Sequence, residues 1–103
     1  MNKNLIPKQF TIAGITIKVK IVDCINNGSC YGIFNDVACE IKVANRVKVD
    51  GVWYDVPENS KINSFFHELF HAFSYYWNTE TPEDLAQVFA NFALEYHQTA
   101  AYE

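Results

Sequence analysis

The stretch "SFFHELFHAF", residues 64–73, sets two histidines and a glutamate in strongly apolar surroundings. At about 3.6 residues per turn, His67 and His71 lie one turn apart on the same side of a helix. The aromatic and aliphatic residues around them fall on one broad face, which predicts a helix over about residues 61–77. Ser60 is the expected N-cap. The stretch therefore indicates an amphipathic helix that carries the histidines on its polar edge.

The chain before this helix is expected to form strands over about residues 9–56. Apolar and polar residues alternate there, as they do in strands with one buried face. The alternation changes phase at Ala13-Gly14, which predicts a tight turn or a bulge. Asp50-Gly51 stands between two β-rich runs and predicts a hairpin.

A second helix is expected over about residues 82–98. Thr81 can cap it, and Pro82 suits its first position. Strands followed by helices predict one α+β domain over residues 1–103. The expected architecture is a mostly antiparallel sheet of three to five strands, followed by two packed helices that carry the site.

Composition excludes two classes of partner. The chain has 103 residues and a net charge of −4, and its basic residues are scattered, so a nucleic-acid partner is not expected. A membrane span is not expected either, because no apolar run approaches about 18 residues. Cys24, Cys30 and Cys39 make an odd count, and no signal-peptide pattern follows Met1. These features favour the reducing cytoplasm and leave the oligomeric state open.

The histidine pair has the spacing of a metal site. Imidazoles at positions i and i+4 can both bind one zinc ion. Glu68 lies about 100° around the helix from His67, beside the metal rather than on it. From there its carboxylate can take a proton from a water that the metal activates. The alternative is that no metal binds and both histidines are ordinary polar surface residues.

A catalytic zinc needs a third protein ligand, and the second helix is its expected source. The candidates there are Glu83, Asp84, Gln87 and His97. Glu83 and His97 are about 21 Å apart along a helix, so both cannot bind one ion. Glu83 requires a wide crossing angle between the helices, whereas a close antiparallel hairpin would bring Gln87 level with His71. Spacing alone leaves this choice open.

These features together resemble a known family, the small zincin-like metallopeptidases of phages and prophages, which have a minimal gluzincin pattern. The matching stretches are "YGIFNDVACEIKVA", "SFFHELFHAF" and "PEDLAQVFANFALEY", and the resemblance covers about residues 10–98. In that family a glutamate at the start of the last helix, followed three residues later by a small residue, is the third ligand. Glu83, with Ala86 after it, matches that pattern. Segment 45–59 is longer than the family pattern and is expected to be a lid or an extra hairpin.

The resemblance implies a zinc-dependent peptidase that hydrolyses peptide bonds in a peptide or protein, with Glu68 as general base. If phage-encoded, it would act in the host cytoplasm. Residues 38–44 are expected to form an edge strand that pairs with the substrate. Side chains that could stabilise the developing charge are Tyr75, Tyr31, Arg46 and His97. The alternative function is a catalytically silent, zinc-stabilised phage or prophage protein that binds a host factor.

Overall fold

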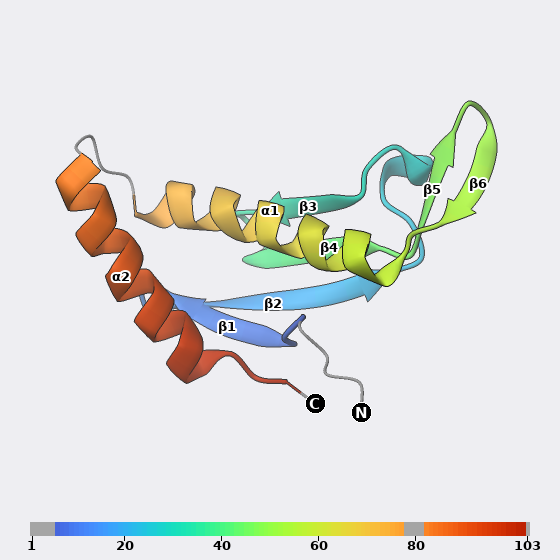
Figure 1. Ribbon diagram of the computed structural model, residues 1–103. Coiled ribbons are helices and arrows are strands. Elements are labelled where there is room, and N and C mark those ends of the chain that lie inside the picture. Colours follow the sequence, from blue (N-terminus) through green and yellow to red (C-terminus); the bar gives the residue numbers. More distant parts are fainter. Residues whose placement is uncertain (1–5, 78–81, 103) are drawn as a thin grey trace.

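Residues 6–77 and 82–102 are described by the computed structural model of the chain (Figure 1). The strands in these ranges are β1 (Gln9–Ile12), β2 (Ile15–Val22), β3 (Gly32–Asn35), β4 (Glu40–Ala44), β5 (Arg46–Val49) and β6 (Val52–Asp55). A short 3-10 turn, η1 (Asn26–Gly28), precedes β3. The helices are α1 (Glu58–Tyr76) and α2 (Pro82–Thr99). Strands followed by two helices confirm the predicted α+β architecture.

The main sheet has the strand order β1-β2-β4-β3. β1 pairs with β2 and β3 pairs with β4 in antiparallel fashion, whereas β2 and β4 are parallel. The expectation that residues 38–44 form an edge strand is wrong, because β4 is bonded on both sides. The edge strands are β1 and β3, and β3 is the one that α1 packs over. The chain takes this order because the hairpin from β3 to β4 inserts its second strand beside β2.

Both predicted turns form, and for the same reason. Ala13 and Gly14 have φ values of 50° and 77°, and Asp50 and Gly51 have values of 51° and 80°. Positive φ at two successive residues is the geometry of a type I′ turn, whose twist matches that of the flanking strands. The phase change at Ala13 is therefore the hairpin that joins β1 and β2.

One face of the main sheet is covered by the helices and forms the core. Ile17, Ile41 and Val43 point to this face and are fully buried together with Phe65 of α1. The alternate residues of the same strands point to solvent, where Glu40 pairs with Lys20 and Lys42 at 2.8 and 3.6 Å. Because side chains alternate along a strand, burying one face fixes the register of the sheet.

The helix α1 begins earlier than the sequence predicts. Its N-cap is Pro57, whose carbonyl accepts hydrogen bonds from the backbone N–H groups of Ser60 and Lys61. Ser60 is therefore inside the first turn and is not the cap. The extended residue before the helix is a proline with φ −62° and ψ 154°, so the helix starts at Glu58 without a side-chain cap.

The helix α2 does not lie alongside α1; Figure 1 shows it crossing at a wide angle and descending beside β1. The two helices touch through aromatic rings, with the Phe73 centroid 5.5 Å from Phe89 and 5.2 Å from Phe92. At the other end of α2, the Thr99 hydroxyl accepts a hydrogen bond from the Thr11 N–H at 2.8 Å. The described contacts of α2 are therefore with Phe73 near the end of α1 and with β1.

Segment 45–59 contains an extra hairpin, β5 and β6, which projects beyond the N-terminal end of α1 (Figure 1). Two cations lie over the Trp53 ring: the distance to the ring centroid is 4.7 Å from Arg46 Cζ and 5.7 Å from Lys48 Nζ. Gly28 of η1 packs against the same two residues, Lys48 and Trp53. The described hairpin residues line neither of the cavities beside the histidines. The segment is therefore a hairpin rather than a lid.

Candidate metal centre

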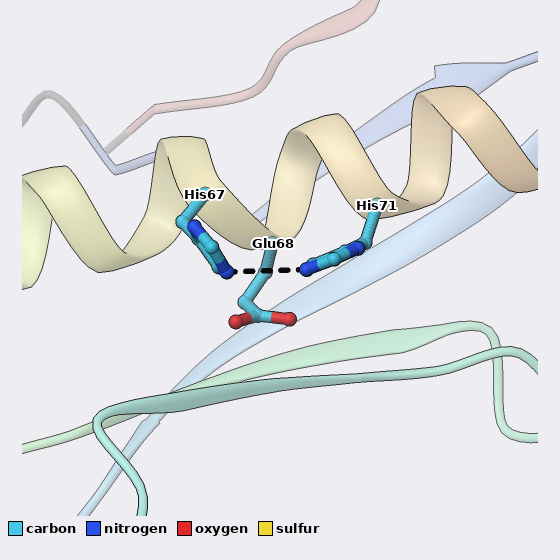
Figure 2. A group of neighbouring side chains, drawn as sticks. All are labelled: His67, Glu68 and His71. Carbon is cyan, nitrogen blue, oxygen red and sulfur yellow. Dashed lines mark hydrogen bonds between the residues drawn. The ribbon is translucent and has the colours of Figure 1, made fainter.

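The rings of His67 and His71 point toward each other from successive turns of α1 (Figure 2). Their Nε2 atoms are 3.1 Å apart, and both side chains are exposed. Two nitrogens on a tetrahedral zinc with bonds of about 2.0–2.1 Å would be about 3.3 Å apart. Without a metal, the same arrangement is one N–H···N hydrogen bond between the imidazoles. The spacing of the two nitrogens therefore fits a shared zinc ion.

Glu68 completes the group predicted from the motif. One carboxylate oxygen and the two imidazole nitrogens all lie within 4.8 Å of one another. Figure 2 shows the carboxylate below and between the two rings, pointing away from α1 toward β3 and β4. The side chain is half-buried, unlike the histidines. A carboxylate in this position can exchange a proton with a water held beside the imidazoles.

Gly32, the first residue of β3, makes room for Glu68. A Cβ atom at this position would lie 3.2 Å from Glu68 Cγ and 3.3 Å from the Lys42 carbonyl oxygen. Both separations are shorter than ordinary van der Waals contact. Sequence reasoning missed this residue, although a glycine at a strand is itself a signal that another group approaches the backbone closely. The group that approaches Gly32 is the Glu68 side chain, and its position depends on how α1 packs over β3.

Two cavities lie between α1 and β3, one on each side of Glu68. The first, of about 530 Å³, extends toward the start of α1 and is lined by Cys30, Tyr31, Gly32, Ser60, Asn63, Ser64, His67 and Glu68. The second, of about 430 Å³, extends toward the end of α1 and is lined by Gly32, Ile33, Phe34, Asp36, Glu68, His71 and Tyr75. Because they share Gly32 and Glu68, they form one groove along the edge strand with the histidines at its middle.

The outer edge of β3 offers backbone groups to this groove. The Tyr31 carbonyl accepts the N–H of Ala44 at 2.9 Å, so these two residues form a hydrogen-bonded pair. Such pairs alternate along an antiparallel ladder. Gly32 and Phe34 are opposite Val43 and Ile41 in the intervening positions, so their N–H and C=O groups point away from β4. An extended peptide can bond to those groups.

Two of the four proposed charge-stabilising residues lie at the groove. Tyr31 lines the first cavity, and Tyr75 lines the second. Tyr75 and Asp36 both line the second cavity, and hydrogen bonding to the Asp36 carboxylate, followed by its negative charge, raises the pKa of Tyr75. Tyr75 therefore stays a neutral hydrogen-bond donor at physiological pH.

The other two lie elsewhere. Arg46 is on β5, where its Nε and Nη2 atoms each donate to Asp23 at 2.9 Å, a paired contact that lowers the pKa of Asp23. His97 is exposed in the last turn of α2, near the end that lies beside β1. Neither residue lines the groove. Nothing in their sequence positions could have placed them, because both depend on where β5 and α2 pack.

The predicted third ligand, Glu83, belongs to the first turn of α2, but its side chain lies outside the described residues. The same holds for the side chains of Asp84 and Gln87. In the part of the chain that the structure describes, the group able to hold a metal consists of His67, Glu68 and His71. Glu83 as a ligand therefore stays a prediction.

No protein-family model, curated protein or solved structure matches the chain. The fold and site therefore define the class of protein by themselves: a small α+β domain with a His-Glu-x-x-His helix lying along an edge strand. Within the described ranges, no helix is both long and apolar enough to cross a membrane.

Proposed function

We propose that this protein is a zinc-dependent peptidase-like hydrolase. His67, His71 and Glu83 hold the ion, and Glu68 is the general base. The observation that carries the proposal is the convergence of one ring nitrogen from each histidine and a Glu68 carboxylate oxygen within 4.8 Å, beside an open strand edge. When bound, zinc supplies an activated water and polarises the carbonyl group of the substrate.

The remaining chemistry belongs to the side chains of this protein. Glu68 takes the proton of the attacking water and returns it to the departing amine, so a single carboxylate serves as base and then acid. Gly32 permits this carboxylate to lie between the histidines and the strand. Tyr31 is a candidate for a hydroxyl that bonds to the carbonyl oxygen as negative charge develops on it. Tyr75 is the second candidate, and its hydroxyl would have to turn from Asp36 to the substrate.

The substrate class follows from the groove. The backbone groups of Gly32 and Phe34 can bond to an extended peptide, which aligns a peptide bond with Glu68. The cavities on both sides of Glu68 give room for side chains before and after that bond. A peptide or an extended protein segment is therefore the substrate, and the reducing cytoplasm, where unpaired Cys24, Cys30 and Cys39 are stable, is the proposed compartment.

Metal analysis of protein purified without a histidine tag tests the proposal. About one zinc per chain is expected for the unaltered protein, and His71→Ala should lose it. His97→Ala is the matched control, because it removes a histidine outside the groove and should retain zinc. Glu68→Gln should also retain zinc while peptide hydrolysis falls about 10²–10⁴-fold. Protein that binds no zinc, or hydrolysis that survives Glu68→Gln, contradicts the proposal.

A second candidate is a catalytically silent, zinc-stabilised phage or prophage protein that binds a host factor. The observation in its favour is the projecting hairpin, where Val52, Trp53 and Tyr54 are 51%, 36% and 54% exposed. Exposed aromatic side chains are enriched at interfaces. Under this reading, Glu68→Gln leaves function in the host unchanged, whereas Trp53→Ala and Tyr54→Ala abolish it.

A further inference from the structure

The second cavity has a chemical character of its own, and we call it the Asp36 pocket. Its aromatic walls are Phe34 of β3 and Tyr75 of α1, whose ring centroids are 6.0 Å apart at an interplanar angle of 63°. Asp36 follows β3 and is exposed. Tyr75 lies one turn beyond His71, about 6 Å along the helix, so the pocket adjoins the candidate metal centre and shares His71 and Glu68 with it.

Apart from the histidine pair and the ion proposed to bind there, the charged side chains along the groove are acidic. Among the described residues that line the two cavities, Asp36 and Glu68 are the carboxylates, and none is a lysine or arginine. Glu68 is engaged beneath the histidines, so Asp36 is the carboxylate of the pocket. An ionised carboxylate has about four acceptor positions, and the Tyr75 hydroxyl at the same cavity can fill one of them. Asp36 therefore retains the capacity to bond with a second donor.

We propose that the Asp36 pocket binds the side chain of a lysine or arginine in the peptide that adds to β3. The aromatic walls accept the methylene stem of such a side chain and attract its cation, while Asp36 pairs with the charged end. A glutamate would be repelled by Asp36, and a glutamine would lack the charge. The inference depends on the proposed function for the extended pose of the peptide, but it does not require turnover.

The register of β3 limits where the basic residue stands. Phe34 is two residues beyond Gly32, about 7 Å along the strand, and Glu68 lies over Gly32. A peptide residue that enters the pocket beside Phe34 is therefore two positions from the residue opposite Gly32. The pocket recognises a residue close to the bond under Glu68 but does not take part in the reaction there.

Binding of labelled peptides to Glu68→Gln protein tests the inference without interference from cleavage. A fluorescent alanine–serine peptide carries one lysine, moved along it residue by residue, and each version is compared with glutamine at the same position by fluorescence anisotropy. We expect the lysine peptides to bind about 5–10-fold more tightly at one register. Asp36→Asn should reduce that ratio to about one, and Asp36→Glu should keep the preference.

Asp50→Asn is the matched control, because it makes the same charge change in the β5–β6 turn and should leave the preference intact. Equal binding of lysine and glutamine peptides at every register overturns the inference. So does a lysine preference that survives Asp36→Asn, or a complete lack of peptide binding. An Asp36-dependent preference in protein that holds no zinc would refute the hydrolase and support the pocket. Zinc-dependent hydrolysis without an Asp36-dependent lysine preference would support the hydrolase and refute the pocket.

Discussion

Replacing Gly32 by alanine perturbs the general base without touching any proposed metal ligand. The new Cβ would lie 3.2 Å from Glu68 Cγ and 3.3 Å from the carbonyl oxygen of Lys42. The carbonyl belongs to the strand ladder and cannot move, so the flexible Glu68 side chain must shift by a few tenths of an ångström. Glu68 Oε2 is only 3.6 Å from the new Cβ, so the carboxylate moves together with the rest of the Glu68 side chain.

The expected result is a selective loss of activity. Misplacing a catalytic group by about 1 Å can cost about 10²-fold, so a shift of a few tenths of an ångström should reduce kcat/KM for peptide hydrolysis about 4–10-fold. Zinc content should stay at about one per chain, because the three atoms nearest the new Cβ belong to Glu68 and Lys42 and not to the histidines. The free energy of unfolding should change by less than about 1 kcal/mol, since the loss of glycine's freedom in the unfolded chain offsets the crowding.

The measurements are metal content, peptide hydrolysis and chemical denaturation on the same preparation. Gly14→Ala is the control, because it alters an open turn with nothing within 4 Å of the new methyl group. It should lower the free energy of unfolding by about 1–2 kcal/mol, because Gly14 has positive φ, and leave hydrolysis unchanged. Activity of Gly32→Ala equal to that of the unaltered protein would show that Glu68 is not positioned by this contact. Loss of zinc would show that the histidines depend on it as well.

Two further predictions concern stability. Gly28→Ala should lower the free energy of unfolding by about 2–5 kcal/mol in urea titration, because its φ is +92° and the Cβ would lie 2.7 Å from Lys48 Cβ and 2.8 Å from the Trp53 ring. Gly14→Ala, also at positive φ but in open space, should cost only about 1–2 kcal/mol, and equal losses would refute the packing argument. Burial, followed by the contact with Cys39, raises the pKa of Tyr76 to about 12. The raised pKa contributes stability that is complete below about pH 10 and is lost as pH rises toward about 12. Thermal melts across this range should therefore show a smaller alkaline loss of stability for Tyr76→Phe than for the unaltered protein. Identical dependence of the melting temperature on pH in the two proteins would contradict this prediction.

Much of the fold could be predicted from the sequence because its signals are local. Gly14 and the Asp50-Gly51 pair are residues that accept positive φ readily, and both hairpins form. The histidine helix follows from its own periodicity and occupies Glu58–Tyr76, with its start two residues before the predicted cap. That error has a local cause too, since Pro57 takes the extended conformation that ends the preceding strand region.

The errors concern how segments distant in the sequence come together. β4 was expected at the edge, yet hydrogen bonding to both β2 and β3 places it inside the sheet. Arg46 was a candidate for the site, but its partner is Asp23, 23 residues earlier in the chain. His97 lies at the end of α2 that packs beside β1, away from the histidine pair. Strand order and helix docking decide such positions, and no local pattern encodes them.

The sequence by itself determined the geometry of His67, Glu68 and His71, because one turn of an α-helix brings side chains at i and i+4 together wherever the helix lies. Only the tertiary structure decided what faces them. Packing α1 over β3 placed Gly32 beneath Glu68 and formed the Asp36 pocket between Phe34 and Tyr75. Those contacts join segments more than 30 residues apart, and they exist only because burying the core brings α1 and β3 together.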